Sequence, residues 1–144
     1  MTSLKKQAYN KLIDCGIKPS SQRTAILEYL LSHHTHPTVE EVYKSVLNEI
    51  PTLSITTVYN TLRLFSEKQA ATMLTIDDHR ICYDGVTTPH AHFYCKQCGT
   101  VIDVLYEGLS DIQTDNVMGN QVTEVHLCFK GLCQKCQSQS DSQL

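Results

Sequence analysis

The sequence lacks any run of apolar residues close to the roughly 20 that a membrane-spanning helix needs. A recognisable export signal is also missing, because Met1 to Lys11 alternates polar and apolar residues. We therefore expect a soluble, cytoplasmic protein with no membrane partner. There is no nucleophile motif, no paired acid and base, and no phosphate-binding glycine loop. These absences argue against an enzyme and against a small organic substrate.

An excess of positive charge is missing as well, since the formal net charge is −3. This value argues at first against nucleic-acid binding, which needs clustered Lys and Arg side chains. The charges are segregated, however: residues 1–70 hold 8 Lys+Arg against 6 Asp+Glu, and residues 71–144 hold 4 against 9. The first half remains a candidate for contact with DNA, and the acidic second half is a candidate for metal binding.

Cysteine is the residue type that the sequence has in unusual number. The seven cysteines are an odd count in a chain without a visible export signal, which favours metal-binding thiols over disulfides. A chain of 144 residues forms one ordinary domain or two small ones. A domain half that size has a barely sufficient hydrophobic core, so we expect it to need a metal or another cross-link.

The first half of the sequence predicts short helices followed by a β-hairpin. Helical spacing of apolar residues and capping residues predict helices over 3–15, 21–33 and 38–50, and a fourth that starts after Ser54. On the fourth helix we expect an inward face made of Ile55, Val58, Leu62 and Phe65. The period then changes to two, which predicts strands at 71–76 and 80–84 around a turn at Asp77-Asp78. This order is typical of a winged helix-turn-helix.

The second half predicts a different kind of domain. Strands at about 90–95, 100–105 and 121–129 enclose a predicted helix at 108–118, which indicates a small α+β fold. We therefore predict an α+β chain with a winged-helix domain at 1–84, a hinge at 85–89, a second domain at 90–137 and a flexible tail at 138–144.

Two Cys-x-x-Cys pairs form the strongest chemical signal in the sequence. Cys95 and Cys98 are separated from Cys133 and Cys136 by 34 residues. Each pair can direct two thiolates at one tetrahedral ion, and four sulfur ligands leave no open coordination position. We predict structural Zn²⁺ that clamps the entry of the second domain to its exit. A pair of redox dithiols is the alternative, and it lacks the strand-to-helix context of thioredoxin-like proteins.

A second candidate metal site contains histidine and aspartate. His90 and His92 lie two residues apart on a predicted strand, so they project to one face, and Asp103 lies on the next predicted strand. Asp84 and His36 are further candidates, although each taken alone is better interpreted as an ordinary residue, His36 in a surface loop and Asp84 at a solvated strand end. Such ligands suit Fe²⁺, Mn²⁺ or Zn²⁺. A non-haem iron enzyme would need the same ligands, with an open position and a substrate pocket.

The predicted fourth helix has an outward face that is rich in hydrogen-bonding groups and poor in carboxylates. Thr56, Thr57, Tyr59, Asn60 and Arg63 are the candidates for contact with bases or phosphates. We expect Lys18, Gln22 and Arg23 to contact the DNA backbone. A packed aromatic in the helix bundle is the alternative role of Tyr59.

Three motifs together resemble the ferric uptake regulator family. They are His36-Pro37-Thr38, the run from Ser54 to Leu62 (SITTVYNTL), and the run from His90 to Cys95 (HAHFYC) followed by Cys98-Gly99. The resemblance extends from about Gly16 to Cys136. It implies a homodimeric transcriptional repressor with an N-terminal winged helix for double-stranded operator DNA, and a C-terminal α/β dimerisation domain with structural zinc.

The resemblance also implies roles for individual residues. The sensory ligands for Fe²⁺ or Mn²⁺ would be His36, Asp84, His90, His92 and Asp103. Aspartate at both carboxylate positions resembles the peroxide-sensing branch of the family, in which a ligand such as His36 or His90 is oxidised. An iron-sensing regulator of the same family is the alternative, and in that branch both positions are usually glutamate.

Four further residues have no predicted metal role. Cys15, Cys82 and Cys128 lie among apolar neighbours, where a buried core thiol is the expected role and a redox role is the alternative. Some relatives have an additional metal site that uses a carboxylate between the two histidines of the His-x-His pair. Here Ala91 occupies that position, so we expect His126 to be an ordinary strand residue.

Overall fold

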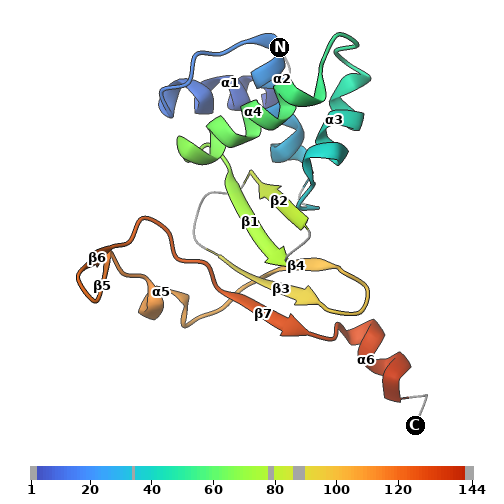
Figure 1. Cartoon of the computed structure of the whole chain (residues 1–144), viewed down its shortest axis with the longest axis vertical. Coiled ribbons are helices and arrows are strands. Elements are labelled where there is room, and N and C mark those ends of the chain that lie inside the picture. Colours follow the sequence, from blue (N-terminus) through green and yellow to red (C-terminus); the bar gives the residue numbers. More distant parts are fainter. Residues whose placement is uncertain (1–2, 34, 78–79, 86–89, 142–144) are drawn as a thin grey trace. The chain divides into compact units, whose positions relative to one another are not determined.

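The computed structural model describes residues 3–33, 35–77, 80–85 and 90–141. The chain divides into two compact units, Met1–Thr87 and Thr88–Leu144, which we call unit 1 and unit 2 (Figure 1). Within the described ranges, no helix combines the length and the apolar character that crossing a membrane requires.

Unit 1 begins with four helices, and hydroxyl side chains cap the starts of the last three. The helices are α1 (Ser3–Asp14), α2 (Ser21–Ser32), α3 (Val39–Leu47) and α4 (Ile55–Glu67). Ser20, Thr38 and Ser54 each accept a hydrogen bond from the backbone N–H three residues later, so a donor at each helix start is satisfied. The third helix ends earlier than the predicted 38–50, because the chain turns after Leu47 and before Pro51.

The four helices enclose one apolar core. Val58, Leu62 and Phe65 of α4 are fully buried, together with side chains of α1, α2 and α3. Ile55 corrects the predicted inward face, because it is 43% exposed. It is the first residue of α4, and the buried face of the helix starts one turn later.

An antiparallel hairpin follows the helices in unit 1. A turn through Gln69, with φ 63°, connects α4 to β1 (Thr72–Asp77), which pairs with β2 (Arg80–Asp84). The predicted turn at Asp77-Asp78 falls partly outside the described residues. Four helices and a hairpin in this order confirm the winged helix-turn-helix (Figure 1).

Unit 2 is built on a three-stranded sheet of order β4-β3-β7. The strands are β3 (Ala91–Cys95), β4 (Val101–Val104) and β7 (Cys128–Gly131). The first pairs antiparallel with β4 and parallel with β7. Among the described residues of this unit, the fully buried apolar side chains are small: Ala91, Cys95 and Cys136. Unit 2 therefore has the weak core that the sequence predicts for a small domain.

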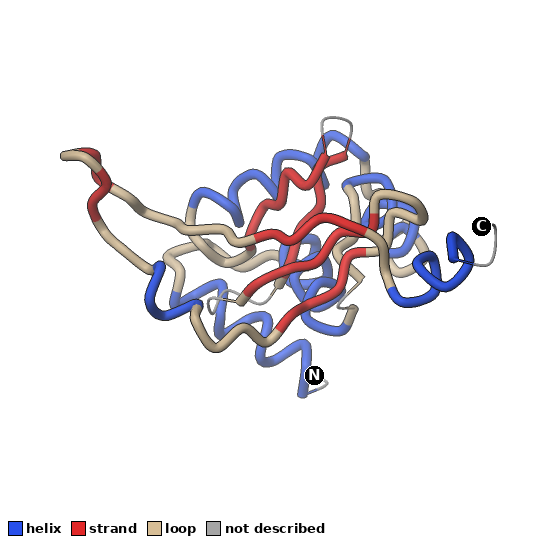
Figure 2. The backbone as a smooth tube through the Cα atoms, turned by 90° about the horizontal axis from the view of Figure 1, so that it is seen from below, coloured by secondary structure: helices blue, strands red, loops and turns tan. Residues whose placement is uncertain are grey.

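The segment between β4 and β7 differs from the prediction. Instead of a helix at 108–118 it contains the short α5 (Leu109–Ile112), and β5 (Asn116–Val117) pairs with β6 (Asn120–Gln121). Of the predicted strand at 121–129, little more than its two ends is extended into strands. Figure 2 shows the small hairpin at the end of two long loops. Within the predicted helix Ile112 is 41% and Met118 is 95% exposed, so these apolar residues do not pack into a core that would stabilise a longer helix.

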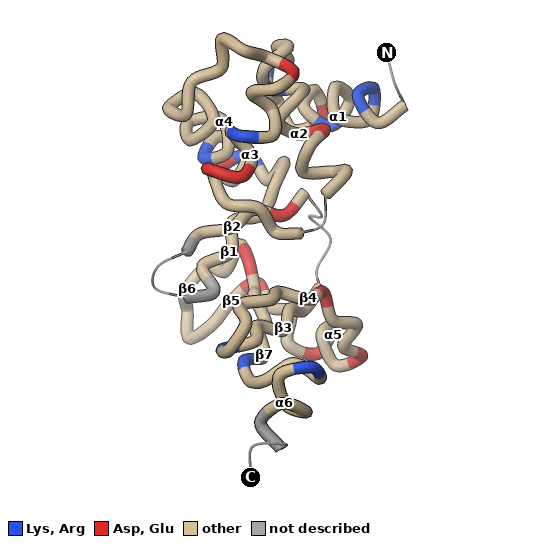
Figure 3. The backbone as a smooth tube through the Cα atoms, turned by 90° about the vertical axis from the view of Figure 1, so that its right-hand side faces the viewer, with Lys and Arg blue, Asp and Glu red and all other residues tan. Residues whose placement is uncertain are grey.

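The C-terminal part of unit 2 is helical. The last helix, α6 (Gln134–Asp141), includes residues where the sequence predicts a flexible tail from 138. Residues 142–144 of that tail, and the predicted hinge apart from Gly85, lie outside the described residues. Lys130 on β7 and Lys135 on α6 give this end of unit 2 positive charge, while Glu107 and Asp111 make the region of α5 acidic (Figure 3).

Candidate metal sites and DNA-binding face

The four cysteines of the two Cys-x-x-Cys pairs meet in unit 2. Cys95 ends β3, Cys98 follows in the turn, and Cys133 and Cys136 lie at the start of α6. The parallel pairing of β3 with β7 brings the two segments together, and the Lys96 N–H donates to the Gly131 carbonyl at 2.8 Å. The four sulfur atoms all lie within 4.8 Å of one another.

The spacing of these sulfur atoms fits a tetrahedral ion. The Sγ atoms of Cys98 and Cys133 are 3.8 Å apart. A zinc–sulfur distance of about 2.3 Å and a tetrahedral angle place two zinc-bound sulfurs about 3.8 Å apart. Gly99, with φ 78°, permits the tight turn after the first pair, and its N–H donates to the Cys95 carbonyl.

Backbone donors and burial give the four thiols different proton affinities. The backbone N–H groups of Cys98 and Cys133 point at the Cys95 sulfur from 3.5 and 3.4 Å and lower its pKa to about 6. Thr100, whose hydroxyl lies 3.0 Å from the Cys98 sulfur, lowers the pKa of that thiol. Burial raises the pKa of Cys136 to about 12. The arrangement stabilises thiolates at one side of the cluster, and thiolates are the form that binds metal.

A second group of metal-binding side chains in unit 2 lies on β3, β4 and the residue before β3. Cross-strand pairing sets His92 opposite Asp103. The Nε2 atoms of His90 and His92 each lie 3.5 Å from Oδ1 of Asp103. Their rings are neighbours, with centroids 4.4 Å apart. The predicted alternation along the strand therefore brings these three side chains together.

Unit 1 holds the other two predicted ligands side by side. Nε2 of His36, in the loop before α3, lies 3.5 Å from Oδ2 of Asp84 at the end of β2. Each side chain is only 2% exposed. A hydrogen bond of 2.9 Å from the Tyr83 N–H to the Pro37 carbonyl joins the two segments. Taken singly, the two residues were expected at the surface, which the structure corrects, whereas the family resemblance names both as metal ligands.

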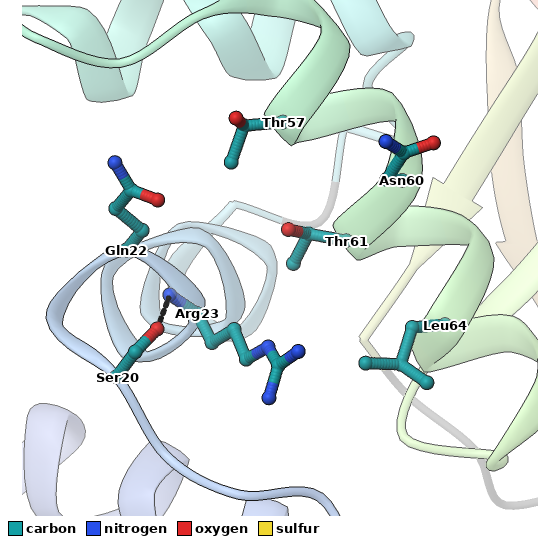
Figure 4. A pocket seen from close by; sticks show the side chains of 7 residues that line it. All are labelled: Ser20, Gln22, Arg23, Thr57, Asn60, Thr61 and Leu64. Carbon is teal, nitrogen blue, oxygen red and sulfur yellow. Dashed lines mark hydrogen bonds between the residues drawn. The ribbon is translucent and has the colours of Figure 1, made fainter.

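Between α2 and α4, unit 1 has a polar cleft of about 350 Å³, which Figure 4 shows. Gln22 and Arg23 reach it from α2, and Thr57 and Asn60 reach it from α4. The Arg23 guanidinium also donates to the Lys18 carbonyl at 2.7 Å. Four of the eight predicted DNA contacts therefore line one cleft.

The remaining predicted contacts on α4 lie apart from this cleft. Thr56 and Tyr59 line a second depression of about 520 Å³ with Ile55 and Ile81, and Tyr59 is 52% exposed. Exposure of Tyr59 excludes its alternative role as a packed core aromatic. Arg63 lies on the surface, where its Nε is 3.3 Å from Glu67. Ile81 on β2 also lines this depression, although nothing in the sequence marks this apolar residue as exposed.

The structure gives three of the four residues without a predicted metal role distinct environments. Cys82 is buried in β2, as expected for a core thiol. The Cys128 thiol is partly buried, and this burial raises its pKa. Nε2 of His126 pairs with Glu124 at 3.0 Å on the surface of unit 2, and it lies in a loop rather than in the predicted strand.

A winged helix-turn-helix followed by a small α+β unit with clusters of metal-binding side chains defines the class of metal-dependent DNA-binding regulators. The family model of the ferric uptake regulator family matches residues 14–130. The chain belongs to this family.

Named relatives give further detail. The chain is 38% identical to the peroxide operon regulator of Bacillus subtilis (strain 168), over 91% of this chain and 92% of that protein. It is 35% identical to the peroxide-responsive repressor PerR of Staphylococcus aureus, over 92% and 90% of the two chains. The solved structure of the Campylobacter jejuni peroxide stress regulator is similar with a TM-score of 0.66 and 26% identity, covering 94% of this chain and 100% of that one.

Proposed function

We propose that this protein is a metal-dependent transcriptional repressor that responds to peroxide, and that it binds operator DNA as a homodimer in the cytoplasm, where that DNA is. The observation that carries the proposal is the set of side chains in the two units: an imidazole and a carboxylate beside each other in unit 1, and two imidazoles with a carboxylate in unit 2. The relatives named as peroxide regulators support the same reading.

In this proposal Cys95, Cys98, Cys133 and Cys136 hold structural Zn²⁺. The sulfur spacing and the lowered pKa of Cys95 support it. Four sulfur ligands leave no position for a substrate, so this site stabilises unit 2 and has no part in sensing.

We assign His36, Asp84, His90, His92 and Asp103 to one regulatory site for Fe²⁺ or Mn²⁺. Nitrogen and oxygen ligands of this kind suit both ions. Ligands from both units would fix the orientation of the DNA-binding unit, and the gain in operator affinity is limited by the difference in metal affinity between the two orientations.

Bound Fe²⁺ would supply the redox chemistry that reduces H₂O₂ next to its ligands. With that chemistry, the O–O bond of the peroxide would break and a carbon-bound hydrogen of the His36 or His90 imidazole would be replaced by hydroxyl, while the second peroxide oxygen would leave as water. An oxidised imidazole is a poorer ligand, so this step releases the constraint between the units and ends repression. Mn²⁺ supports DNA binding without this step.

The surface of unit 2 supports a homodimer. Ile102, Phe129 and Leu132 are 44%, 38% and 41% exposed, and with Phe93 they line an apolar cleft of about 520 Å³. Contiguous exposed apolar residues of this kind mark interaction surfaces. A second copy of the chain covers them in the proposed dimer.

For DNA binding we assign α4 to the major groove. Thr56, Thr57, Tyr59, Asn60 and Arg63 face the bases and phosphates, while Lys18, Gln22 and Arg23 contact the DNA backbone. The polar cleft between α2 and α4 supports this assignment, because it carries amide, hydroxyl and guanidinium groups on one surface.

An operator-release assay tests the function. The probe is a duplex selected from a random library by the Mn²⁺-loaded protein. Peroxide should release the Fe²⁺-loaded protein from this duplex and leave the Mn²⁺-loaded protein bound, and mass spectrometry should find one added oxygen on the peptide of His36 or His90. Release with intact histidines contradicts the peroxide mechanism. Equal resistance of both loaded forms indicates the iron-sensing alternative.

The variant His36→Ala tests the proposed link between the units. It should abolish metal-dependent operator binding and retain zinc. His33→Ala is the matched control, because His33 lies three residues earlier, is exposed and stacks on Tyr29. Normal operator binding by Mn²⁺-treated His36→Ala would show that no such link exists.

A further inference from the structure

The backbone immediately after Asp84 is held from two sides within unit 1. On one side, Nζ of Lys11 donates a 2.8 Å hydrogen bond to the Gly85 carbonyl, across 74 residues of sequence. On the other side, Gly85 lies against α2: a Cβ atom at this position would be 3.0 Å from both C and O of Leu30. The end of β2 is therefore fixed between α1 and α2.

The partners of this contact connect it to the ligand pair of unit 1. Gly85 follows Asp84 directly, and Asp84 lies 3.5 Å from His36. On the N-terminal side of Asp84, the Tyr83 N–H donates a hydrogen bond to the carbonyl of Pro37, the residue after His36. One hydrogen bond thus fixes the chain before Asp84 and another fixes it after, which leaves the carboxylate little freedom to turn away from His36.

Lys11 is an unusual residue for such a contact. It lies on the partly buried side of α1, one residue before the fully buried Leu12. Partial burial of this ammonium group costs free energy and lowers the pKa of Lys11, and the hydrogen bond to a carbonyl and the nearby Cys15 and Asp84 offset only part of that cost. An exposed lysine would avoid this cost, so we infer that the hydrogen bond to Gly85 is the reason for the partial burial of Lys11.

We propose that Lys11 is a positioning residue for the regulatory metal site: by holding the Gly85 carbonyl it keeps the Asp84 carboxylate beside His36, and it ties α1 to the ligand pair. This inference rests on the proposed function, because it assigns Asp84 and His36 to metal binding. It adds the first helix of the DNA-binding unit to the elements that respond to the ion.

A competing effect of Lys11 has the opposite sign. As a nearby cation it repels a divalent ion, so loss of the charge alone would tighten metal binding. Loss of the positioning contact would weaken metal binding. The sign of the change in metal affinity therefore separates a positioning role from a simple charge effect.

The test measures Mn²⁺ affinity of the zinc-loaded full-length protein by titration. Lys11→Met keeps the length of the side chain and removes the donor, and we expect its dissociation constant for Mn²⁺ to rise about tenfold with the zinc content unchanged. Lys11→Arg keeps charge and donor, and should stay within about threefold of the wild type. Lys5→Met is the matched control on α1, because Lys5 pairs with Glu49 on the surface.

Gly85→Ala keeps the proposal testable if Lys11→Met is unstable, and hydrogen exchange adds a second readout on folded Lys11→Met. Gly85→Ala leaves Lys11 intact and forces Gly85 away from Leu30, so it should also weaken Mn²⁺ binding. In the metal-free protein, hydrogen exchange of the peptide Ile81–Gly85 should be faster in Lys11→Met than in Lys5→Met. This second readout does not depend on the metal.

The outcomes distinguish this proposal from the proposed function. If His36→Ala weakens Mn²⁺ binding while Lys11→Met leaves it unchanged or tighter, the regulatory site stands and the positioning role is overturned. If the wild-type protein does not bind Mn²⁺, the proposed function and this inference both fail. Weakened binding in Lys11→Met and Gly85→Ala, with rescue by arginine, supports the positioning role.

Discussion

Replacing Cys95 by serine should unfold unit 2 and leave unit 1 folded. The fully buried apolar side chains described in unit 2 are Ala91, Cys95 and Cys136. A buried CH₂ or CH₃ group contributes about 0.8 kcal/mol, so these side chains supply only a few kcal/mol.

The proposed zinc site adds a cross-link that this small core lacks. Structural zinc sites contribute about 10–16 kcal/mol of apparent binding free energy at neutral pH. Cys95 is the cysteine whose sulfur is approached by two backbone N–H groups, so its loss removes a ligand and leaves these donors without a thiolate acceptor. Unit 1 keeps its own core around Phe65 and Leu62, which contains none of the four cysteines of the proposed zinc site.

Hydrogen exchange measured by mass spectrometry, with zinc content measured in parallel, is the assay. In Cys95→Ser, peptides from β3 and β7 should exchange at the rate of an unfolded chain, while peptides from α2 and α4 stay protected. Cys128→Ser is the matched control, because this cysteine is in the same unit but outside the cluster. One zinc ion per chain in Cys95→Ser, with a protected β3, would refute the reasoning.

Three other predictions concern the helices and the remaining thiol. Ser54→Ala removes the cap that accepts the Thr57 N–H at 3.1 Å, and chemical denaturation should show unit 1 destabilised by about 1 kcal/mol; no change would mean that water replaces the cap fully. Phe65→Ala should cost about 3–5 kcal/mol in the same assay, because Phe65 is fully buried, whereas a loss below about 1 kcal/mol would contradict the described core. Burial raises the pKa of Cys128 above its ordinary value of 9.0, so its alkylation by iodoacetamide should be slower at pH 8 than in the unfolded protein, and its rate should keep rising with pH beyond 9, where the rate for an ordinary thiol levels off. Because the folded state then holds the proton more tightly than the unfolded state, the stabilisation from the neutral thiol is lost as the pH rises through the raised pKa, and equal alkylation rates in both states would argue against burial.

Local signals account for the parts of the fold that the sequence predicts well. Helices α2, α3 and α4 start at hydroxyl caps and contain apolar residues at helical spacing, so each is specified by its own segment. The pairing of the two Cys-x-x-Cys segments was also predictable, because four thiols at this spacing can satisfy one ion only by coming together.

The parts that the sequence does not predict depend on distant residues. The predicted helix at 108–118 is replaced by the short α5 and a small hairpin, and nearby apolar residues do not pack into a core: Leu105 and Met118 are almost completely exposed. The burial of His36 with Asp84 requires the loop before α3 to pair with β2. Lys11 gave no signal, because its contact with Gly85 joins positions 74 residues apart.

The parallel pairing of β3 with β7 has a consequence for biosynthesis. Cys95 and Cys98 leave the ribosome well before Cys133 and Cys136. The strand β7, which completes the sheet, is translated just before Cys133. Unit 1 can fold while the rest of the chain is still being translated. The cluster of Cys95, Cys98, Cys133 and Cys136 can form only when translation is almost complete. A prematurely terminated chain would therefore be released with a folded unit 1 and without the cross-link of unit 2.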